Sequence, residues 1–403
     1  MKKHRISDII TIVLFLSILF GFGAAFWILP DVDVSQVEGR PMQQTPSFTT
    51  GYRDNASLVT YTGTDYLLHG YLADEFDEYY CDQFPLRRFF LGLHAATESL
   101  SYRGVNGGVL KVGDELAVTR FDAAGFTGLT EYYSEEHVRA ALGNLHSVCE
   151  GLDVPVKVML PPRSIDVKAP FMGYPTEISD SLHLLTEEVM GEEYVELLSY
   201  MRRLMEDGHK PYFTTDHHWT VEGAYEAYAT LMRDWGLTPY AKEDFEFVTV
   251  TEDFQGTTLR NGNYFYMEGE SLQLARYEGD EDFTVTLLSK LLTPGEEYEG
   301  LYNFAATETE DAYSIFLHGK PLQMSITLEG AERETLLVYK DSFGHSLVPF
   351  LARHFDIFVL DNQSETYGNN ISSAVAATGA DRVLVVYNME NVIETGKLAN
   401  LKG

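Results

Sequence analysis

Residues 214–220 of this 403-residue chain read TTDHHWT, which brings a carboxylate, two imidazoles and an indole together. An Asp can fix the tautomer of a nearby His and stabilise its protonated form, as in the triads that activate a nucleophile in hydrolases and acyltransferases. Asp216 and His218 are therefore candidates for an orienting carboxylate and a general base. A simpler interpretation is a polar turn that caps the following helix.

Apolar residues at helical spacing follow this stretch over residues 221–235. Thr220 is suited to the N-cap of that helix and Gly236 to its end. We therefore expect the candidate acid and base to lie on the turn just before a helix, with Trp219 facing the core.

A nucleophile for this pair is found in residues 339–345, which read YKDSFGH. Ser342 follows an expected strand and precedes an expected helix, so backbone N–H groups at the helix start could stabilise an oxyanion beside it. N-capping alone would also explain a Ser here. We expect solvated positions for Lys340 and His345. The chain order Asp, His, Ser differs from the Ser, Asp, His order of the α/β-hydrolases.

The last seventy residues alternate strand and helix patterns, which predicts a parallel sheet with helices on its faces. Active residues of such sheets gather past the carboxyl ends of the strands, where Ser342 and Asn388 fall. Residues 240–330 combine short strand-like runs with acidic loops whose order the pattern does not give. The expected strands are residues 154–160, 335–339, 357–360 and 383–387, and the expected helices are residues 133–150, 345–354 and 370–378.

The amino terminus carries an uncharged run over residues 9–29. As a helix rising about 1.5 Å per residue, this run would cross about 30 Å of hydrocarbon. The basic residues before it favour a cytoplasmic tip. A cleaved signal peptide with Gly23-Ala24-Ala25 at its cleavage site is the alternative. We expect a cytoplasmic tip and transmembrane signal-anchor over residues 1–30, a juxtamembrane connector over residues 31–70 and an extracytosolic catalytic domain over residues 71–403.

The composition excludes some classes of partner. A formal net charge of −32 makes nucleic acid and anionic lipid poor partners, because phosphate binding needs clustered Lys and Arg. Cys81 and Cys149 are the two cysteines, too few for a Cys-based zinc site, and whether they form a disulfide stays open. Asp-His-His also occurs in manganese-dependent phosphoesterases, but the further metal motifs of those enzymes are not found here. We expect neither metal nor cofactor.

The sequence resembles the DHHW protein family, extracytosolic relatives of the alginate O-acetylation proteins, whose domains are similar to SGNH hydrolases. The resemblance runs from about residue 36 to 395, and its two main blocks are specific as a pair. The matching residues are 216–220 (DHHWT), 223–225 (GAY), 340–343 (KDSF) and 346–351 (SLVPFL), with Glu38, Arg40, Tyr79, Asp82, 84–87 (FPLR) and 105–107 (VNG).

The resemblance implies a flavodoxin-like, SGNH-hydrolase-like α/β domain. It implies Ser342 as nucleophile, His218 as general base and Asp216 as the carboxylate that orients it. His218 is chosen over His217 because the alginate relatives read Asp-x-His-Trp in this block. Asn388 resembles the oxyanion-hole Asn of the wider superfamily, whereas the Gly donor of that pattern has no clear match.

The activity implied is O-acetyl transfer to a cell-envelope or exported polysaccharide through a Ser-acetyl intermediate. A membrane-bound O-acyltransferase of the multispanning type is the implied partner that supplies acetyl groups. Two alternatives stay open. One is a carbohydrate O-acetyl esterase with the same triad, and the other is a non-catalytic protein that binds or assembles polysaccharide.

Overall fold

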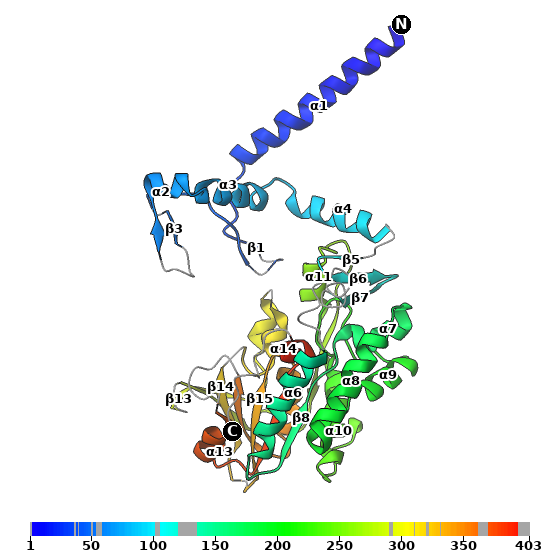
Figure 1. The fold of residues 1–403 in the computed structure, drawn as a ribbon, viewed down its shortest axis with the longest axis vertical. Coiled ribbons are helices and arrows are strands. Elements are labelled where there is room, and N and C mark those ends of the chain that lie inside the picture. The colour runs from blue at the N-terminus through cyan, green and yellow to red at the C-terminus, as the bar shows by residue number, and fades with distance from the viewer. Residues whose placement is uncertain are drawn as a thin grey trace. The chain divides into compact units, whose positions relative to one another are not determined.

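The computed structural model describes residues 2–35, 38, 40–49, 51–53, 59–100, 105–119, 135–289, 293–309, 311–319, 322–330, 332–361 and 370–393. The chain divides into two compact units, Met1–Thr97 and Glu98–Gly403. The N-terminal helix lies in the first unit and the large sheet in the second (Figure 1).

The first unit begins with α1 (Lys2–Ile28), of which the segment Ile6–Ile28 is long and apolar enough to cross a membrane. This confirms the expectation of an apolar N-terminal helix of spanning length. The other elements are α2 (Gly63–Leu68), α3 (Tyr71–Asp82), the start of α4 (Arg87–Leu100), and the short strand pairs β1 (Val34–Ser35) with β2 (Arg40–Pro41) and β3 (Tyr52–Arg53) with β4 (Thr60–Tyr61).

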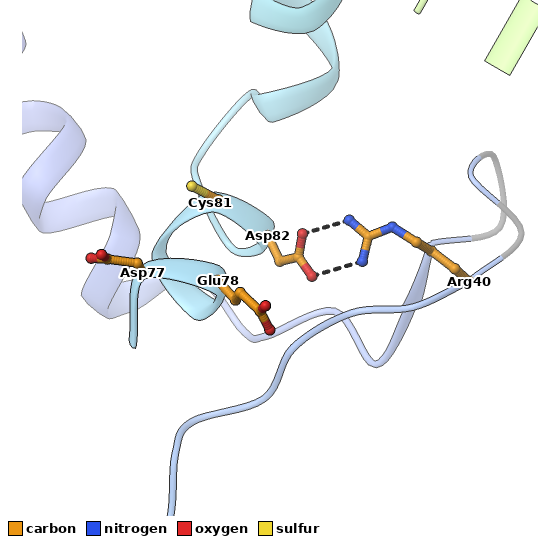
Figure 2. Close-up of a pocket in the computed structure, with 5 residues that line it drawn as sticks. All are labelled: Arg40, Asp77, Glu78, Cys81 and Asp82. Atoms are coloured by element: carbon orange, nitrogen blue, oxygen red, sulfur yellow. Dashed lines mark hydrogen bonds and ion pairs between the residues drawn. The ribbon is translucent and has the colours of Figure 1, made fainter. Parts of the chain in front are cut away.

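Ion pairs fasten the segment after α1 to the end of α3. The Arg40 guanidinium donates to both oxygens of Asp82, at 2.9 Å and 2.6 Å, and the backbone N–H of Gln43 donates to the same carboxylate at 2.8 Å. Figure 2 shows this pair in a pocket that Asp77, Glu78 and Cys81 also line. These contacts lie within the first compact unit, Met1–Thr97. The connector over residues 31–70 and the catalytic domain over residues 71–403 stay predictions.

The second unit is built on an eight-stranded sheet in the order β13-β12-β14-β16-β15-β17-β8-β9. The five strands from β16 to β9 are parallel, and β14, β12 and β13 extend the sheet in antiparallel fashion. Their bounds are β8 (Val156–Met159), β9 (Tyr194–Val195), β12 (Phe283–Leu288), β13 (Pro294–Glu299), β14 (Gln323–Leu328), β15 (Thr335–Lys340), β16 (Asp356–Asp361) and β17 (Arg382–Val386).

Across the sheet, the parallel strands follow one another as β16, β15, β17, β8 and β9. If β15 is numbered 1, β16 2, β17 3, β8 4 and β9 5, this is the flavodoxin strand order 2-1-3-4-5. The chain therefore follows a circular permutation of that topology. This explains how an Asp-His block can precede the Ser in sequence. The predicted α/β fold with a mainly parallel sheet is confirmed, while the antiparallel extension was not anticipated.

Helices cover both faces of the sheet. Alternate residues of β15 point to opposite sides, so Val338 joins one hydrophobic core and Tyr339 the other. The first core contains residues of α9 (Leu198–Glu206), α10 (Val221–Asp234) and α12 (Gly344–Leu351). The second contains residues of α6 (Glu135–Glu150), α8 (Glu177–Met190), α13 (Ile371–Thr378) and α14 (Met389–Ile393). Strands buried on both faces read as nearly continuous apolar runs, which is why the sequence revealed them.

Smaller elements stand beside the sheet. A hairpin forms from β6 (Val109–Val112) and β7 (Glu115–Val118), with β5 (Val105–Asn106) beside β6, and α7 (Ser164–Met172) packs on it. A second hairpin pairs β10 (Glu246–Phe254) with β11 (Glu270–Arg276), and α11 (Thr257–Asn261) lies between them in the chain. Cys81 and Cys149 are free thiols.

Candidate active site

The turn between β15 and α12 presents Ser342 at the carboxyl edge of the sheet. Its neighbouring strand β17 is paired in register, Lys340 with Val386, so Asn388 follows at the same edge. Gly344 starts α12 where a Cβ would lie 2.7 Å from Cδ of Lys340. Glycine therefore lets the helix begin directly above the Lys340 side chain.

The Asp-His block forms a closed loop just before α10, as predicted. An isolated bridge between Tyr212 and Trp219 joins the ends of the loop. The Trp219 indole is fully buried, and its Nε1 donates to Ser346 Oγ on α12 at 2.9 Å. Thr220 caps α10 by accepting from Gly223 N at 3.3 Å. Trp219 thus anchors the carboxyl end of the loop both to the core and to α12, the helix that follows Ser342.

Asp216, His218 and Ser342 lie in one hydrogen-bonded line. His218 Nδ1 is 2.5 Å from Asp216 Oδ1, and His218 Nε2 is 2.6 Å from Ser342 Oγ. With the proton on Nδ1 donated to the carboxylate, Nε2 is the acceptor for the serine hydroxyl. The distance between His218 and Ser342 is within hydrogen-bond reach of a nucleophile and its base.

The second carboxylate oxygen of Asp216 is held from α11. Thr257 donates to Oδ2 through its backbone N–H at 2.7 Å and its Oγ1 at 3.0 Å. Gly256 makes this approach possible, because a Cβ there would lie 2.2 Å from Cβ of Asp216. Burial alone would raise the pKa of Asp216, but the neighbouring imidazoles and these hydrogen bonds outweigh it and hold the pKa well below its ordinary value. The carboxylate is therefore charged at neutral pH.

Aromatic rings flank the His218 imidazole. Tyr313 stacks on it with ring centroids 4.4 Å apart, and the Phe343 ring lies 4.9 Å away. The Tyr313 hydroxyl is 3.2 Å from Ser346 Oγ, the atom that also accepts from Trp219. These contacts fix the plane of the imidazole and place apolar surface around the base.

A second carboxylate, Asp341, shapes the nucleophile turn. It accepts from Phe343 N at 2.9 Å, Asn388 N at 2.7 Å and Asn391 Nδ2 at 2.6 Å. Burial raises its pKa above the ordinary value. The Asn388 side chain donates to Pro161 O at 3.4 Å, so it lies at the edge of the site between β17 and the end of β8. Its role as an oxyanion donor stays a prediction.

Lys340 and His345 are buried, contrary to the solvated positions expected from sequence. Lys340 Nζ lies 2.9 Å from His345 Nε2 and 3.5 Å from Asp361 Oδ2, at the end of β16. Burial lowers the pKa of Lys340. The expectation failed because a Lys at the end of a central strand finds its partners in the next helix and strand, which sequence spacing does not reveal.

His217 packs against the hydrogen-bonded line, with its ring centroid 3.9 Å from that of His218. Its Nδ1 is 2.6 Å from Thr257 Oγ1. Potential metal-ligand atoms of Asp216, His217 and His218 lie within 4.8 Å of one another. Both ring nitrogens of His218 and both oxygens of Asp216 already take part in the hydrogen bonds described above, so this donor set fits a proton-transfer line better than a cation site.

Several residues of the site were not identified from the sequence. The most prominent is Glu270, at the start of β11, which accepts from Thr214 N at 3.0 Å and from Thr215 N and Oγ1 at 2.5 Å and 2.6 Å. It holds the backbone immediately before Asp216. Thr257, Tyr313, Asn391 and Glu270 lie in segments without a recognisable motif, so only the folded chain brings them to the site.

Comparisons with known proteins agree with this arrangement. A family model described as DHHW protein matches residues 187–360. A DHHW family protein from Eubacterium siraeum superposes with a TM-score of 0.56 at 18% identity, covering 74% of this chain and 97% of its own. PatB1 from Bacillus cereus gives 0.55 at 20% identity, with 72% and 98% covered.

A structure of PatB1 with a sulfonyl adduct gives a TM-score of 0.54 at 20% identity and covers 68% of this chain and 93% of its own. No curated protein sequence matches the chain. At these identities the structural likeness establishes the fold. The family model and the shared fold confirm that this chain resembles the DHHW protein family.

Proposed function

We propose that this protein is a serine O-acetyltransferase that modifies a cell-envelope or exported polysaccharide. The observation that carries the proposal is the line from Asp216 through His218 to Ser342, with 2.5 Å and 2.6 Å between successive partners. Such a line activates a hydroxyl that is otherwise a weak nucleophile at neutral pH.

In the first half-reaction Ser342 Oγ attacks the carbonyl carbon of an acetyl donor while its proton passes to His218 Nε2. The charged Asp216 stabilises the imidazolium that forms. Collapse of the tetrahedral intermediate breaks the bond to the donor's leaving group, which takes the proton from His218. The acetyl group is then an ester of Ser342.

Charge on the tetrahedral oxygen calls for hydrogen-bond donors near Ser342. We assign this role to the backbone N–H of Ser342, which has no hydrogen-bond acceptor among the described residues, and to the Asn388 side chain.

In the second half-reaction a sugar hydroxyl gives its proton to His218 Nε2 and attacks the acetyl-serine. The Ser342 oxygen leaves and recovers its proton from His218. Water in place of the sugar would give an esterase. The rings of Tyr313 and Phe343 lie beside the His218 imidazole. Exclusion of water from the acetyl-enzyme by these rings would favour transfer over hydrolysis.

The location and partners belong to the same proposal. We assign α1 as a single-pass anchor with the remainder of the chain outside the cytoplasm, on the strength of its apolar length and the basic residues before it. Acetyl donors are made in the cytoplasm, so a multispanning membrane-bound O-acyltransferase would pass acetyl groups to Ser342.

The proposal is tested with the full chain in detergent, as wild type, Ser342→Ala and Ser199→Ala, the last an exposed serine on α9 as control. Acetyl release from an activated acetyl ester is followed with and without candidate oligosaccharides. We expect wild type and the Ser199→Ala control to release acetyl groups and Ser342→Ala to release none. We also expect the oligosaccharide to gain acetyl mass. Release to water alone would assign an esterase, and equal release by all three proteins would leave a non-catalytic binding or assembly role.

A further inference from the structure

Helix α4 and the residue before it expose an apolar stripe made of Leu86, Phe89, Phe90 and Leu93. Their exposed fractions are 66%, 61%, 40% and 50%. Successive members are three residues apart, or adjacent in the case of Phe89 and Phe90, so they share one face of the helix. Gly92 and Ala95 are buried on the other side of α4. The helix is thus amphipathic, with its larger apolar side chains turned outward.

Ring contacts fix the start of this stripe against α1. Phe22 stacks on Phe84 with centroids 5.5 Å apart and planes 9° apart, and it meets Phe90 edge-on at 5.6 Å. One turn further along α1, Phe26 stacks on Tyr80 at 4.3 Å. Since α1 carries the membrane-crossing segment, the apolar stripe continues a surface that already belongs to lipid.

The depth of the contact also fits a membrane surface. Phe22 precedes the end of α1 at Ile28 by six residues, about 9 Å along a helix. Trp27 then lies near the helix end, where aromatic residues mark the boundary between lipid and water. Amphipathic helices that lie on a membrane bury their apolar face about 5–10 Å into that boundary. Phe90, in contact with Phe22, is therefore at the depth expected for such a helix.

We propose that α4 lies in the outer surface of the bilayer, with the apolar stripe inserted beside α1 as a second point of membrane attachment. The proposal rests on the proposed anchoring of α1. The attachment uses apolar contact, because exposed acidic residues on the adjoining α3, such as Asp74 and Asp77, repel anionic headgroups. Phosphatidylcholine, which is zwitterionic and has no net charge, is therefore a sufficient lipid.

The test uses full-length protein in phosphatidylcholine bilayers, with Cys81→Ser and Cys149→Ala so that single nitroxide labels can be placed. The labelled positions are Leu93→Cys on the stripe, Arg88→Cys on the opposite face of α4 and Leu16→Cys within α1. Collision rates with oxygen, which concentrates in hydrocarbon, and with a water-soluble nickel complex report the surroundings of each label. We expect oxygen to dominate at Leu16 and Leu93 and nickel to dominate at Arg88, with an oxygen-to-nickel ratio several times higher at Leu93 than at Arg88.

The inference would be overturned if the label at Leu93 collided with nickel as often as the label at Arg88 while the label at Leu16 stayed in hydrocarbon. The proposed anchoring of α1 would then remain intact. Nickel contact at Leu16 would instead refute the anchor on which the inference rests. A Leu93 label that leaves water only after a membrane protein partner is added would assign the stripe to that partner and overturn insertion into lipid.

Discussion

Replacing Asp216 by Asn is the most informative perturbation of the hydrogen-bonded line, because each oxygen of the carboxylate is an acceptor. Oδ1 accepts from His218 Nδ1 at 2.5 Å and Oδ2 accepts from Thr257 N at 2.7 Å. An Asn has one acceptor oxygen and one NH2 donor. If the NH2 faces His218, the imidazole must carry its proton on Nε2 and cannot accept from Ser342. If the NH2 faces Thr257, two donors oppose each other at Oδ2.

The expected magnitude follows from this conflict. The corresponding Asp-to-Asn change in a serine protease triad lowers kcat about 10⁴-fold through the wrong tautomer, and we expect a loss of the same order here. Thr257→Val removes the 3.0 Å hydroxyl bond and keeps the backbone N–H. A hydrogen bond to a charged group contributes about 1.5 kcal/mol, which corresponds to about a tenfold loss.

The assay is acetyl release from an activated ester by Asp216→Asn, Thr257→Val and Thr257→Ser, with circular dichroism to verify folding. Thr257→Ser keeps the hydroxyl and should retain activity close to wild type. The order of losses should be Asp216→Asn far above Thr257→Val, and Thr257→Val above Thr257→Ser. A folded Asp216→Asn protein within tenfold of wild type would refute the role of Asp216.

Three further predictions concern the support of the site and the core. Glu270→Gln should lower kcat about tenfold with little change in KM, because the loop before Asp216 loses an acceptor, whereas the exposed Glu268→Gln should not; steady-state kinetics decides. Trp219→Phe should lower the free energy of unfolding in urea by about 1 kcal/mol more than Trp235→Phe, since Trp219 Nε1 donates to Ser346 while no described residue accepts from Trp235 Nε1. Burial beside Arg333 and Arg353 lowers the pKa of His354 to about 4, so the unfolded chain binds more protons below its ordinary pKa of 6.5 and stability falls between pH 6.5 and 4. The resulting loss in the free energy of unfolding is about 3 kcal/mol for a fully buried ring and about 1 kcal/mol for this half-buried one. Urea titrations at about pH 6.5 and about pH 4 should show this contribution in wild type and not in His354→Gln.

The fold was most predictable where strands are buried on both faces. Residues 335–339 and 383–387 are nearly continuous apolar runs, and they form β15 and β17 within one residue at each end. The antiparallel strands β12 to β14 were not predicted, because their sequences mix polar and apolar residues and their pairing depends on β16. Pairing across such distances leaves no local pattern.

The candidate site was predictable to the extent that short motifs carry it. Asp216, His218 and Ser342 were named from the sequence and the family resemblance, and the structure brings the three together. The groups that hold them, Thr257 and Glu270, act through hydrogen bonds to backbone and carboxylate atoms that are 41 and 55 residues away in the chain. A lone Thr or Glu has no periodicity or spacing that indicates such a contact.

Reaction of the full chain with a sulfonyl fluoride tests the central claim most directly, because the adduct is an irreversible record of the nucleophile. The serine oxygen bonds to sulfur as fluoride leaves, and the proton passes to the base. Tandem mass spectrometry is expected to find one adduct per chain, on Ser342, and to find it strongly reduced in a folded His218→Ala variant. An adduct on another residue, or none on folded wild-type protein, would contradict the assignment of Ser342 as the nucleophile activated by His218.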